Sequence, residues 1–259
     1  GKDLDEVHEM NFYQLADNPV TPFGDHIGQA GYNWTIPEVW AQLQASSNYV
    51  SRKADVATFN TANKWRKKGI ALSPVKYVMQ TSYYSSGALV CVYADGTVLV
   101  STGGSELGQG LNTKVALCAA YTLGIPLEKV TVGPRETSKV PNNTATGGSG
   151  TSESSSEATI LACQQIVDRL KPYTSAGKSW DDAVAAAVGD NVSLMASSWE
   201  HLTDKVNTNH YATYGAAVSE VTVDVLTGEV LVDRVDILMD LGTQLDAAVD
   251  VGQVTGGFM

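Results

Sequence analysis

Residues 88–110 read ALVCVYADGTVLVSTGGSELGQG, and this stretch decides the fold class. Its first half contains two runs rich in β-branched residues, which flank Ala94-Asp95-Gly96. An Asp-Gly pair between such runs is typical of a β-hairpin. Its second half, Gly103–Gly110, places four glycines in eight positions. A helix is expected to follow from Asn112 to Leu123, because Gly124 and Pro126 then end the apolar pattern.

Apolar residues at helical or strand spacing predict further elements on both sides of this stretch. Upstream, Thr35-Ile36-Pro37-Glu38 is typical of a helix start, and a second helix is expected over Asp55–Lys68, with Gly69 as its end. Downstream, the expected elements are a strand over 129–132, a long helix over 151–170 that Pro172 stops, a short helix capped by Ser179, a hairpin of 218–225 with 230–239, and a buried helix over 246–259.

Together these elements predict an α+β fold of antiparallel β-hairpins covered by helices. We expect an N-terminal helical and loop segment over residues 1–86, leading into one α+β domain over residues 87–259. Hydrophobic residues make up 43% of the 259 residues and charged residues only 17%, which is the composition of a globular protein rather than a disordered one.

Charge and cysteine usage exclude several classes of protein. The formal net charge of −11 argues against nucleic-acid binding, and the one basic run, Lys64 with Arg66-Lys67-Lys68, is expected to be a solvated helix end. No apolar stretch approaches the ~20 residues of a membrane helix, so no membrane partner is expected. Cys91, Cys118 and Cys163 form no CxxC pair, which predicts buried free thiols in a reducing compartment rather than a zinc or iron–sulfur site.

Two small-residue loops carry the candidate chemistry. Gly103–Gly110 lies between a strand and a helix, where such a loop points unpaired N–H groups outward and the helix dipole favours an anion. It is neither a Walker A loop nor a dinucleotide fingerprint, so a phosphate cradle and a tight structural turn both remain open. Thr146–Glu153 repeats the pattern with many hydroxyl donors, and Ser149 or Thr151 as a plain helix cap is the alternative. Two such loops in one domain favour a shared anionic ligand.

At these loops, and at the lone amide of Gln253, the chain resembles the xanthine dehydrogenases and aldehyde oxidases of the molybdenum hydroxylase family. The resemblance covers nearly the whole chain in family order, and it implies an internal segment of the molybdopterin-binding region. It is carried by Gly103–Gly110 with Asn112-Thr113-Lys114, by Val140-Pro141-Asn142 with Gly147-Gly148-Ser149, by 250–254 with Gly257-Phe258, and more weakly by 51–53 and 65–69.

In that family a pterin dithiolene with a phosphate or dinucleotide tail holds molybdenum, so the resemblance implies cofactor contacts in this chain. Gly148 is implied to pass close to the ligand sphere of the metal, and no catalytic residue is implied. The implied contacts to the pterin or its phosphate are Leu107, Gly108, Gln109, Ser149, Gly150, Thr151, Ser152 and, from the other side, Gln253.

The activity that the resemblance implies is hydroxylation of a purine, another N-heterocycle or an aldehyde, with oxygen from water. The family's general-base glutamate, its substrate-pocket Arg and Phe, and its FAD and 2Fe–2S domains are implied to lie elsewhere in a parent polypeptide. We therefore expect the segment alone to be inert and the parent to be a cytoplasmic homodimer. The alternatives are a non-catalytic molybdopterin-binding module and a degenerate interaction domain of the same fold.

One departure from the family pattern concerns the substrate. Before Gly87-Ala88-Leu89, where xanthine enzymes carry a Phe-Thr pair, this chain reads Val78-Met79-Gln80-Thr81-Ser82 and is shorter. A purine stacked between two aromatic rings would lose one of these rings there, unless Tyr83 or Tyr84 takes its place. An aldehyde or a different N-heterocycle is therefore at least as well supported as xanthine.

Overall fold

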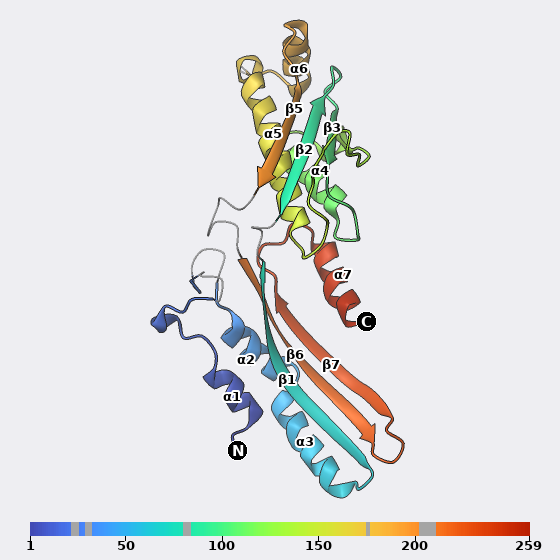
Figure 1. The fold of residues 1–259 in the computed structure, drawn as a ribbon. Helices are drawn as coiled ribbons and strands as arrows, with labels where there is room; N and C mark the ends of the chain where they lie inside the picture. The colour runs from blue at the N-terminus through green and yellow to red at the C-terminus, as the bar shows by residue number, and fades with distance from the viewer. Residues whose placement is uncertain (22–25, 29–32, 80–83, 175–176, 202–210) are drawn as a thin grey trace. The chain divides into compact units, whose positions relative to one another are not determined.

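The computed structural model describes residues 1–21, 26–28, 33–79, 84–174, 177–201 and 211–259, and Figure 1 shows its helices and strands. Its contacts divide the chain into two compact units, Gly1–Met79 with His210–Thr243 and Gln80–Asn209 with Gln244–Met259. This division differs from the expected boundary after residue 86. Residues 66–79 pair with residues 211–224, so the first unit is assembled from two separate stretches of chain. The second unit consists of the residues between these stretches together with residues 244–259.

Within the described residues, the first unit is built on a three-stranded antiparallel sheet. Its strands lie in the order β1 (Arg66–Met79), β6 (Tyr211–Asp224) and β7 (Val230–Asp240). Its helical segments are α1 (Leu4–Met10), η1 (Leu15–Asp17), α2 (Ile36–Ser46) and α3 (Tyr49–Ala62). A hydrophobic core joins the helices to one face of the sheet, and its buried members are Val39, Trp40, Leu43, Tyr49, Leu72, Ala216 and Val218.

The first unit confirms some predicted elements and corrects one. Helix α2 starts after Thr35, and the hairpin of β6 with β7 is present. The helix predicted over Asp55–Lys68 is wrong at both ends, because α3 runs over Tyr49–Ala62 and Gly69 lies inside β1. The long antiparallel pairing of β1 with β6 makes residues 66–68 part of a strand, and this pairing outweighs the local helical period.

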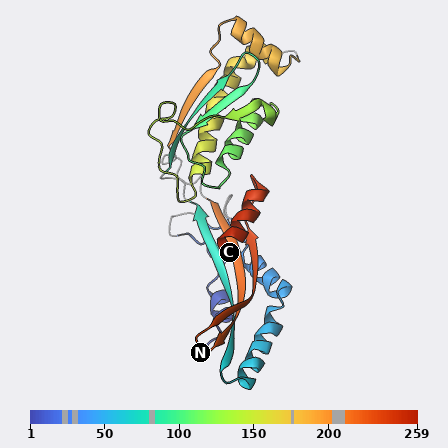
Figure 2. The ribbon, with the colours of Figure 1, turned by 90° about the vertical axis from the view of Figure 1, so that its right-hand side faces the viewer.

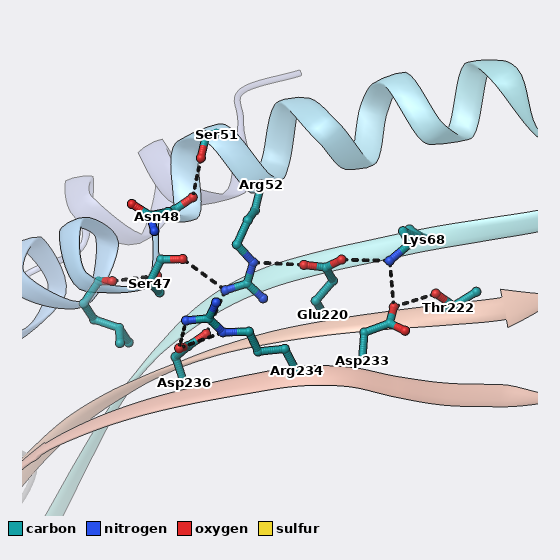
Figure 3. Close-up of polar contacts among 11 residues, drawn as sticks. Ser47, Asn48, Ser51, Arg52, Lys68, Glu220, Thr222, Asp233, Arg234 and Asp236 are labelled. Atoms are coloured by element: carbon teal, nitrogen blue, oxygen red, sulfur yellow. Dashed lines mark hydrogen bonds and ion pairs between the residues drawn. The ribbon is translucent and has the colours of Figure 1, made fainter.

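The basic run is a solvated helix end only in part, because Lys64 and Arg66 are exposed just after α3 whereas Lys67 and Lys68 have partners within the protein. Lys67 donates to the backbone carbonyls of Asn60 and Asn63 at the end of α3, at 2.5 Å each. Lys68 lies on β1 and forms ion pairs with Glu220 and Asp233, each at 3.0 Å. Figure 3 shows how this lysine enters a larger network, in which the same Glu220 also meets a guanidinium group from α3.

The second unit contains a four-stranded sheet within the described residues, in the order β4-β3-β2-β5. Its strands are β2 (Ser85–Val92), β3 (Val98–Thr102), β4 (Val130–Val132) and β5 (Met195–His201). Its helical segments are α4 (Leu111–Leu123), η2 (Leu127–Lys129), α5 (Thr151–Thr174), α6 (Trp180–Gly189) and α7 (Ala247–Phe258). The predicted hairpin of β2 with β3 is confirmed, and the short β4 adds one parallel pairing.

Helices α4 and α5 cover this sheet, and Figure 2 shows them side by side against it. Apolar residues of β2, β3, α4, α5 and α6 form one core, with Val90, Val100, Val115, Ile166 and Val184 among its fully buried members. The fold is therefore α+β, with mainly antiparallel sheets covered by helices.

One helix boundary and the burial of one helix differ from the sequence expectations. Pro172 lies inside α5, which continues to Thr174, because a proline in the last turn removes a single helix hydrogen bond. The helix expected near the C-terminus is present as α7, but it is not buried, since Val251 is 62% exposed. The cap of α6 is confirmed, because the Ser179 hydroxyl accepts the N–H of Asp182 at 3.2 Å.

Among the helices that the structure describes, none has the length and hydropathy needed to cross a bilayer.

The three cysteines are free, with Cys163 buried and the other two half-buried. Burial raises the pKa of the Cys163 thiol to about 12 and also raises the pKa of Cys91 and Cys118. A thiol with a raised pKa is a poor nucleophile and metal ligand, because the thiolate is the reactive form.

Candidate functional site

The two small-residue loops meet in the second unit at the starts of α4 and α5. A Cβ placed on the buried Gly104 would lie 2.5 Å from Thr151 Cγ2 and 2.7 Å from Leu111 Cδ2, the first residues of the two helices. The backbone N–H of Ser105 donates to Thr146 Oγ1 at 2.9 Å, which ties the first loop directly to the second. The structure thus brings together the two loops that the sequence singled out.

Within the first loop, a carboxylate of the chain itself fills the place expected for an external anion. Glu106 Oε1 accepts the N–H groups of Gly108 at 3.1 Å and Gly110 at 2.9 Å, and Oε2 accepts the N–H of Asn112 at 3.0 Å. Burial would raise the pKa of Glu106, but these three backbone donors and the nearby Arg135 outweigh it and lower the pKa. The expectation that these N–H groups point outward, unpaired, is therefore wrong.

Gln109 closes the same loop. Its Oε1 accepts the N–H of Leu107 at 2.7 Å, and its Nε2 donates to the carbonyl of Ser105 at 2.8 Å. The amide is nevertheless at the surface, beside Gly108 and beside Leu107, whose side chain is 70% exposed. Leu107, Gly108 and Gln109, which were predicted to contact a pterin, thus form one rim at the surface, with Leu107 and Gly108 exposed and Gln109 half-buried. The hydrogen bonds of Glu106 and Gln109 hold this rim in shape.

The second loop differs from the first, because the residue before its helix is Gly150, which has no side chain that could cap the helix. Gly150 precedes α5 and accepts the first helical hydrogen bond, from Ser154 N at 3.2 Å, but it has no side chain to accept from the first-turn N–H groups. The other helices of this unit contrast with α5. Asp246 caps α7, Ser179 caps α6 and Glu106 caps α4. The start of a helix carries a partial positive charge that attracts an anion, and at α5 no Gly150 side chain stands in front of it.

Left-handed backbone shapes this second loop. Gly148 and Ser149 have φ values of +54° and +64°, and both are exposed, whereas Gly150 is buried and Ser152 is half-buried. Ser149 in this conformation is strained, because left-handed φ values are uncommon for residues other than glycine. Backbone strain of this kind is often found at functional sites.

Buried polar atoms without a partner gather where the loops meet. Among the described residues, Asn143 Oδ1, Thr151 Oγ1 and Thr102 Oγ1 are buried and accept or donate no hydrogen bond. Asn143 lies over Gly103, since a Cβ on that glycine would come within 2.5 Å of Asn143 Cβ, and Thr151 lies over the neighbouring Gly104. Unsatisfied buried polar atoms cost free energy, so a polar ligand at this junction would stabilise the fold.

The third predicted element, α7, starts against the first loop. A Cβ on Gly110 would lie 2.9 Å from Val249 Cγ2 in the first turn of α7. Gln253 lies one helical turn beyond Val249, and residues four apart share a helix face. Its side chain is exposed. The structure thus places the helix of Gln253 next to the first loop.

Sequence reasoning missed the roles of three residues. Glu106 follows the first two glycines of its loop, and the N–H groups that it accepts lie two, four and six residues further on, so a cap search could have found it. Asn143 has no local signal, because its position over Gly103 depends on the meeting of two distant loops. The third is Tyr84, whose ring lies against Gly150 and whose hydroxyl lies against Gly148. Tyr83 lies outside the described residues.

Replacing Glu106 with glutamine is expected to destabilise the protein by about 1–2 kcal/mol, because an amide has one acceptor oxygen where the carboxylate uses two. Hydrogen exchange followed by mass spectrometry should show faster exchange in a peptide spanning 105–115, with a lower melting temperature. Glu136→Gln, at a residue half-exposed elsewhere in the same unit, is the control. Unchanged exchange in this peptide would contradict the role assigned to Glu106.

Comparison with known proteins adds a family and several relatives. The model of the molybdopterin cofactor-binding domain matches residues 42–259. Xanthine dehydrogenase of Oryza sativa subsp. japonica is 41% identical over 98% of this chain, and xanthine dehydrogenase/oxidase of Felis catus is 38% identical over 100% of it. The chain spans about a fifth of the length of these relatives, 19% and 20% respectively.

Solved structures show the same fold at lower identity. CO dehydrogenase from Oligotropha carboxidovorans is 20% identical, with a TM-score of 0.81 over 98% of this chain and 36% of that one. Aldehyde oxidoreductase from Desulfovibrio desulfuricans ATCC 27774 is 22% identical, with a TM-score of 0.74 over 98% of this chain and 28% of that one. At these identities the likeness concerns the arrangement of the helices and strands.

Proposed function

Because this chain belongs to the molybdopterin cofactor-binding domain family, we propose that it holds the molybdenum cofactor of an oxidoreductase that hydroxylates a purine, another N-heterocycle or an aldehyde. The observation that carries the proposal is the meeting of the α4 and α5 starts around Gly104, beside the first turn of α7. A large anionic group needs contacts from several directions, and residues of these three elements would supply them.

The residues at this junction fit such a group. Thr151 Oγ1 and Asn143 Oδ1 are buried without a partner, one able to donate and the other able to accept. The start of α5, which follows a glycine, would offer first-turn N–H groups to a phosphate, and Ser152 would add a hydroxyl. The start of α4 offers less, since Glu106 takes its N–H groups. Anion binding is therefore assigned to the second loop and recognition of the pterin edge to the first.

Each predicted site residue has a place in this proposal. Gly148, Ser149, Gly150, Thr151 and Ser152 would hold the cofactor from the α5 side, Leu107, Gly108 and Gln109 from the exposed rim, and Gln253 from α7. The bound cofactor supplies the two-electron redox chemistry, and this chain supplies hydrogen bonds, orientation and exclusion of water. The flavin and iron–sulfur groups, the homodimer and the cytoplasmic location implied by the resemblance stay predictions.

The proposal is tested by the metal content of the full-length polypeptide that carries this chain. Gln109→Ala removes the two bonds that close the first loop, to Leu107 N and Ser105 O. Loss of a residue that supports a metal site typically costs 10–100-fold in affinity, so we expect roughly tenfold less molybdenum per polypeptide by elemental analysis. Gln164→Ala, on the exposed side of α5, is the matched control.

Two results would count against the assignment. Absence of molybdenum from the unmodified polypeptide would remove the proposed function altogether. Equal molybdenum in wild type and Gln109→Ala would remove only the role of that glutamine. For the substrate class, turnover of hypoxanthine and of an aromatic aldehyde by the same preparation gives a direct comparison.

A further inference from the structure

Tyr84 is fixed beside the second loop by two backbone contacts of the residue that follows it. The N–H of Ser85 donates to Thr144 Oγ1 at 2.9 Å, and the N–H of Thr144 donates to the carbonyl of Ser85 at 3.1 Å. These bonds tie the first residue of β2 to the loop that leads into α5. The position of the Tyr84 side chain along this loop is therefore set by the backbone.

The ring of Tyr84 lies lengthwise along the loop, in the space that two missing side chains would occupy. A Cβ on Gly150 would overlap the Cδ2 and Cε2 edge of the ring and lie 2.7 Å from Cγ. A Cβ on Gly148 would overlap the hydroxyl oxygen and lie 3.3 Å from Cζ. A side chain at either position would collide with Tyr84 in this conformation, and at Gly148 the left-handed φ of +54° also favours glycine.

The hydroxyl of Tyr84 has different surroundings from its ring. It lies against Gly148, the exposed glycine at the left-handed turn, whereas the ring body lies against the buried Gly150. A phenylalanine would fill the same space over Gly150, so packing alone does not require the oxygen. A phenolic O–H is a hydrogen-bond donor, and an anion is its strongest acceptor.

We propose that Tyr84 is a further cofactor-contacting residue, whose ring shapes the loop at the start of α5 and whose hydroxyl donates a hydrogen bond to the anionic group bound at Gly148. This inference rests on the proposed function, because it requires the molybdenum cofactor at this loop. The Tyr84 side chain thus has two roles, packing of the ring against the loop and donation of a hydrogen bond by the hydroxyl. Replacement by phenylalanine keeps the ring and removes only the hydroxyl.

The ring task is tested by stability without reference to the cofactor. Gly148→Ala is expected to destabilise the protein in part through collision with the Tyr84 oxygen and in part through its φ of +54°. In a Tyr84→Phe background the collision is removed, so the same substitution should lower the melting temperature less. Equal losses in both backgrounds would place the ring elsewhere and overturn the inference.

The hydroxyl task is tested in the full-length polypeptide. Tyr84→Phe should fold with the melting temperature of wild type, lose molybdenum roughly tenfold faster on dilution, and alter the electron paramagnetic resonance signal of the partly reduced metal. Tyr93→Phe, a half-exposed tyrosine one residue past β2, is the matched control and should change neither readout.

The outcomes separate this inference from the proposed function. Wild type that contains molybdenum, with Tyr84→Phe unchanged in both metal loss and resonance signal, would overturn the role of Tyr84 and leave the cofactor assignment standing. Wild type without molybdenum would overturn both. Faster metal loss in Tyr84→Phe with an unchanged melting temperature is the expected result.

Discussion

Gly104→Ala is expected to lower the free energy of unfolding by about 1–3 kcal/mol, because the added methyl group has no room. It would lie 2.5 Å from Thr151 Cγ2, 2.7 Å from Leu111 Cδ2 and 3.0 Å from Ser155 Oγ. Leu111 and Ser155 are 0% exposed and Thr151 is 4% exposed, so none of them can move into solvent. The helix starts must separate instead, and chemical denaturation of the variant measures the cost.

The same substitution should also reduce bound molybdenum in the full-length polypeptide, because it separates the two loops proposed to hold the cofactor. Gly147→Ala is the matched control, since a Cβ there meets no atom within 4 Å and its φ is ordinary. It lies in the second loop itself, so it tests the effect of an added methyl group alone. Wild-type stability in Gly104→Ala would mean that the two helix starts do not meet at this glycine.

Glu220→Gln is expected to destabilise the protein by about 1–3 kcal/mol through the charge network of the first unit. The Glu220 carboxylate accepts from Arg52 Nε at 2.9 Å and from Lys68 Nζ at 3.0 Å (Figure 3). The Arg52 and Glu220 side chains are only 12% and 15% exposed, so their interaction is weakly screened by water. Arg52 keeps Asp236 as a partner at 2.7 Å, and this limits the loss.

The effect of Glu220→Gln should depend on pH in a defined direction. Burial would raise the pKa of Glu220, but the hydrogen bonds from Lys68 and Arg52 outweigh it and lower the pKa. A carboxyl group whose pKa is lowered by folding stabilises the protein above its unfolded pKa of about 4.3, and that stabilisation is lost as the pH falls through the lowered value. The difference between wild type and variant should therefore be constant near neutrality and shrink in acid.

Unfolding measured from neutral pH down to about pH 3 tests this prediction. Glu229→Gln, at an exposed position between β6 and β7, is the control and should follow wild type throughout. A Glu220→Gln variant as stable as wild type at neutral pH would show that the network contributes no net stability, as happens for many ion pairs. A difference that grows in acid would contradict the direction assigned to the pKa.

Local sequence signals predicted those elements whose ends depend on nearby residues. The β2–β3 hairpin follows from Ala94-Asp95-Gly96, and α4 ends at Gly124 with φ +69°. The cap at Ser179 also depends on a bond within one turn of helix. In each case the interacting groups lie within a few residues, so the pattern in the sequence contains the whole interaction.

The expectations that failed depend on residues far away in the sequence. The helix expected over Asp55–Lys68 ends early because β1 pairs with β6, as in the register Arg66↔Asp224. Within the basic run, Lys68 is not freely solvated because it meets Glu220 of β6 and Asp233 of β7. The expected burial of α7 failed in the same way, since an apolar pattern shows that a face can be buried and not what will cover it.

By itself, the sequence determined the α+β class, the two loops that lead into helices, and the resemblance that identified the cofactor. These properties follow from residue types at fixed spacings along the chain. Only the tertiary structure decided that Glu106 occupies the amides of the first loop, that this loop meets the start of α5 at Gly104, and that Tyr84 lies against the glycines at 148 and 150. The physical reason is that hydrogen bonds and steric contacts act over a few ångströms in space, whereas the residues that make them can be tens of positions apart along the chain.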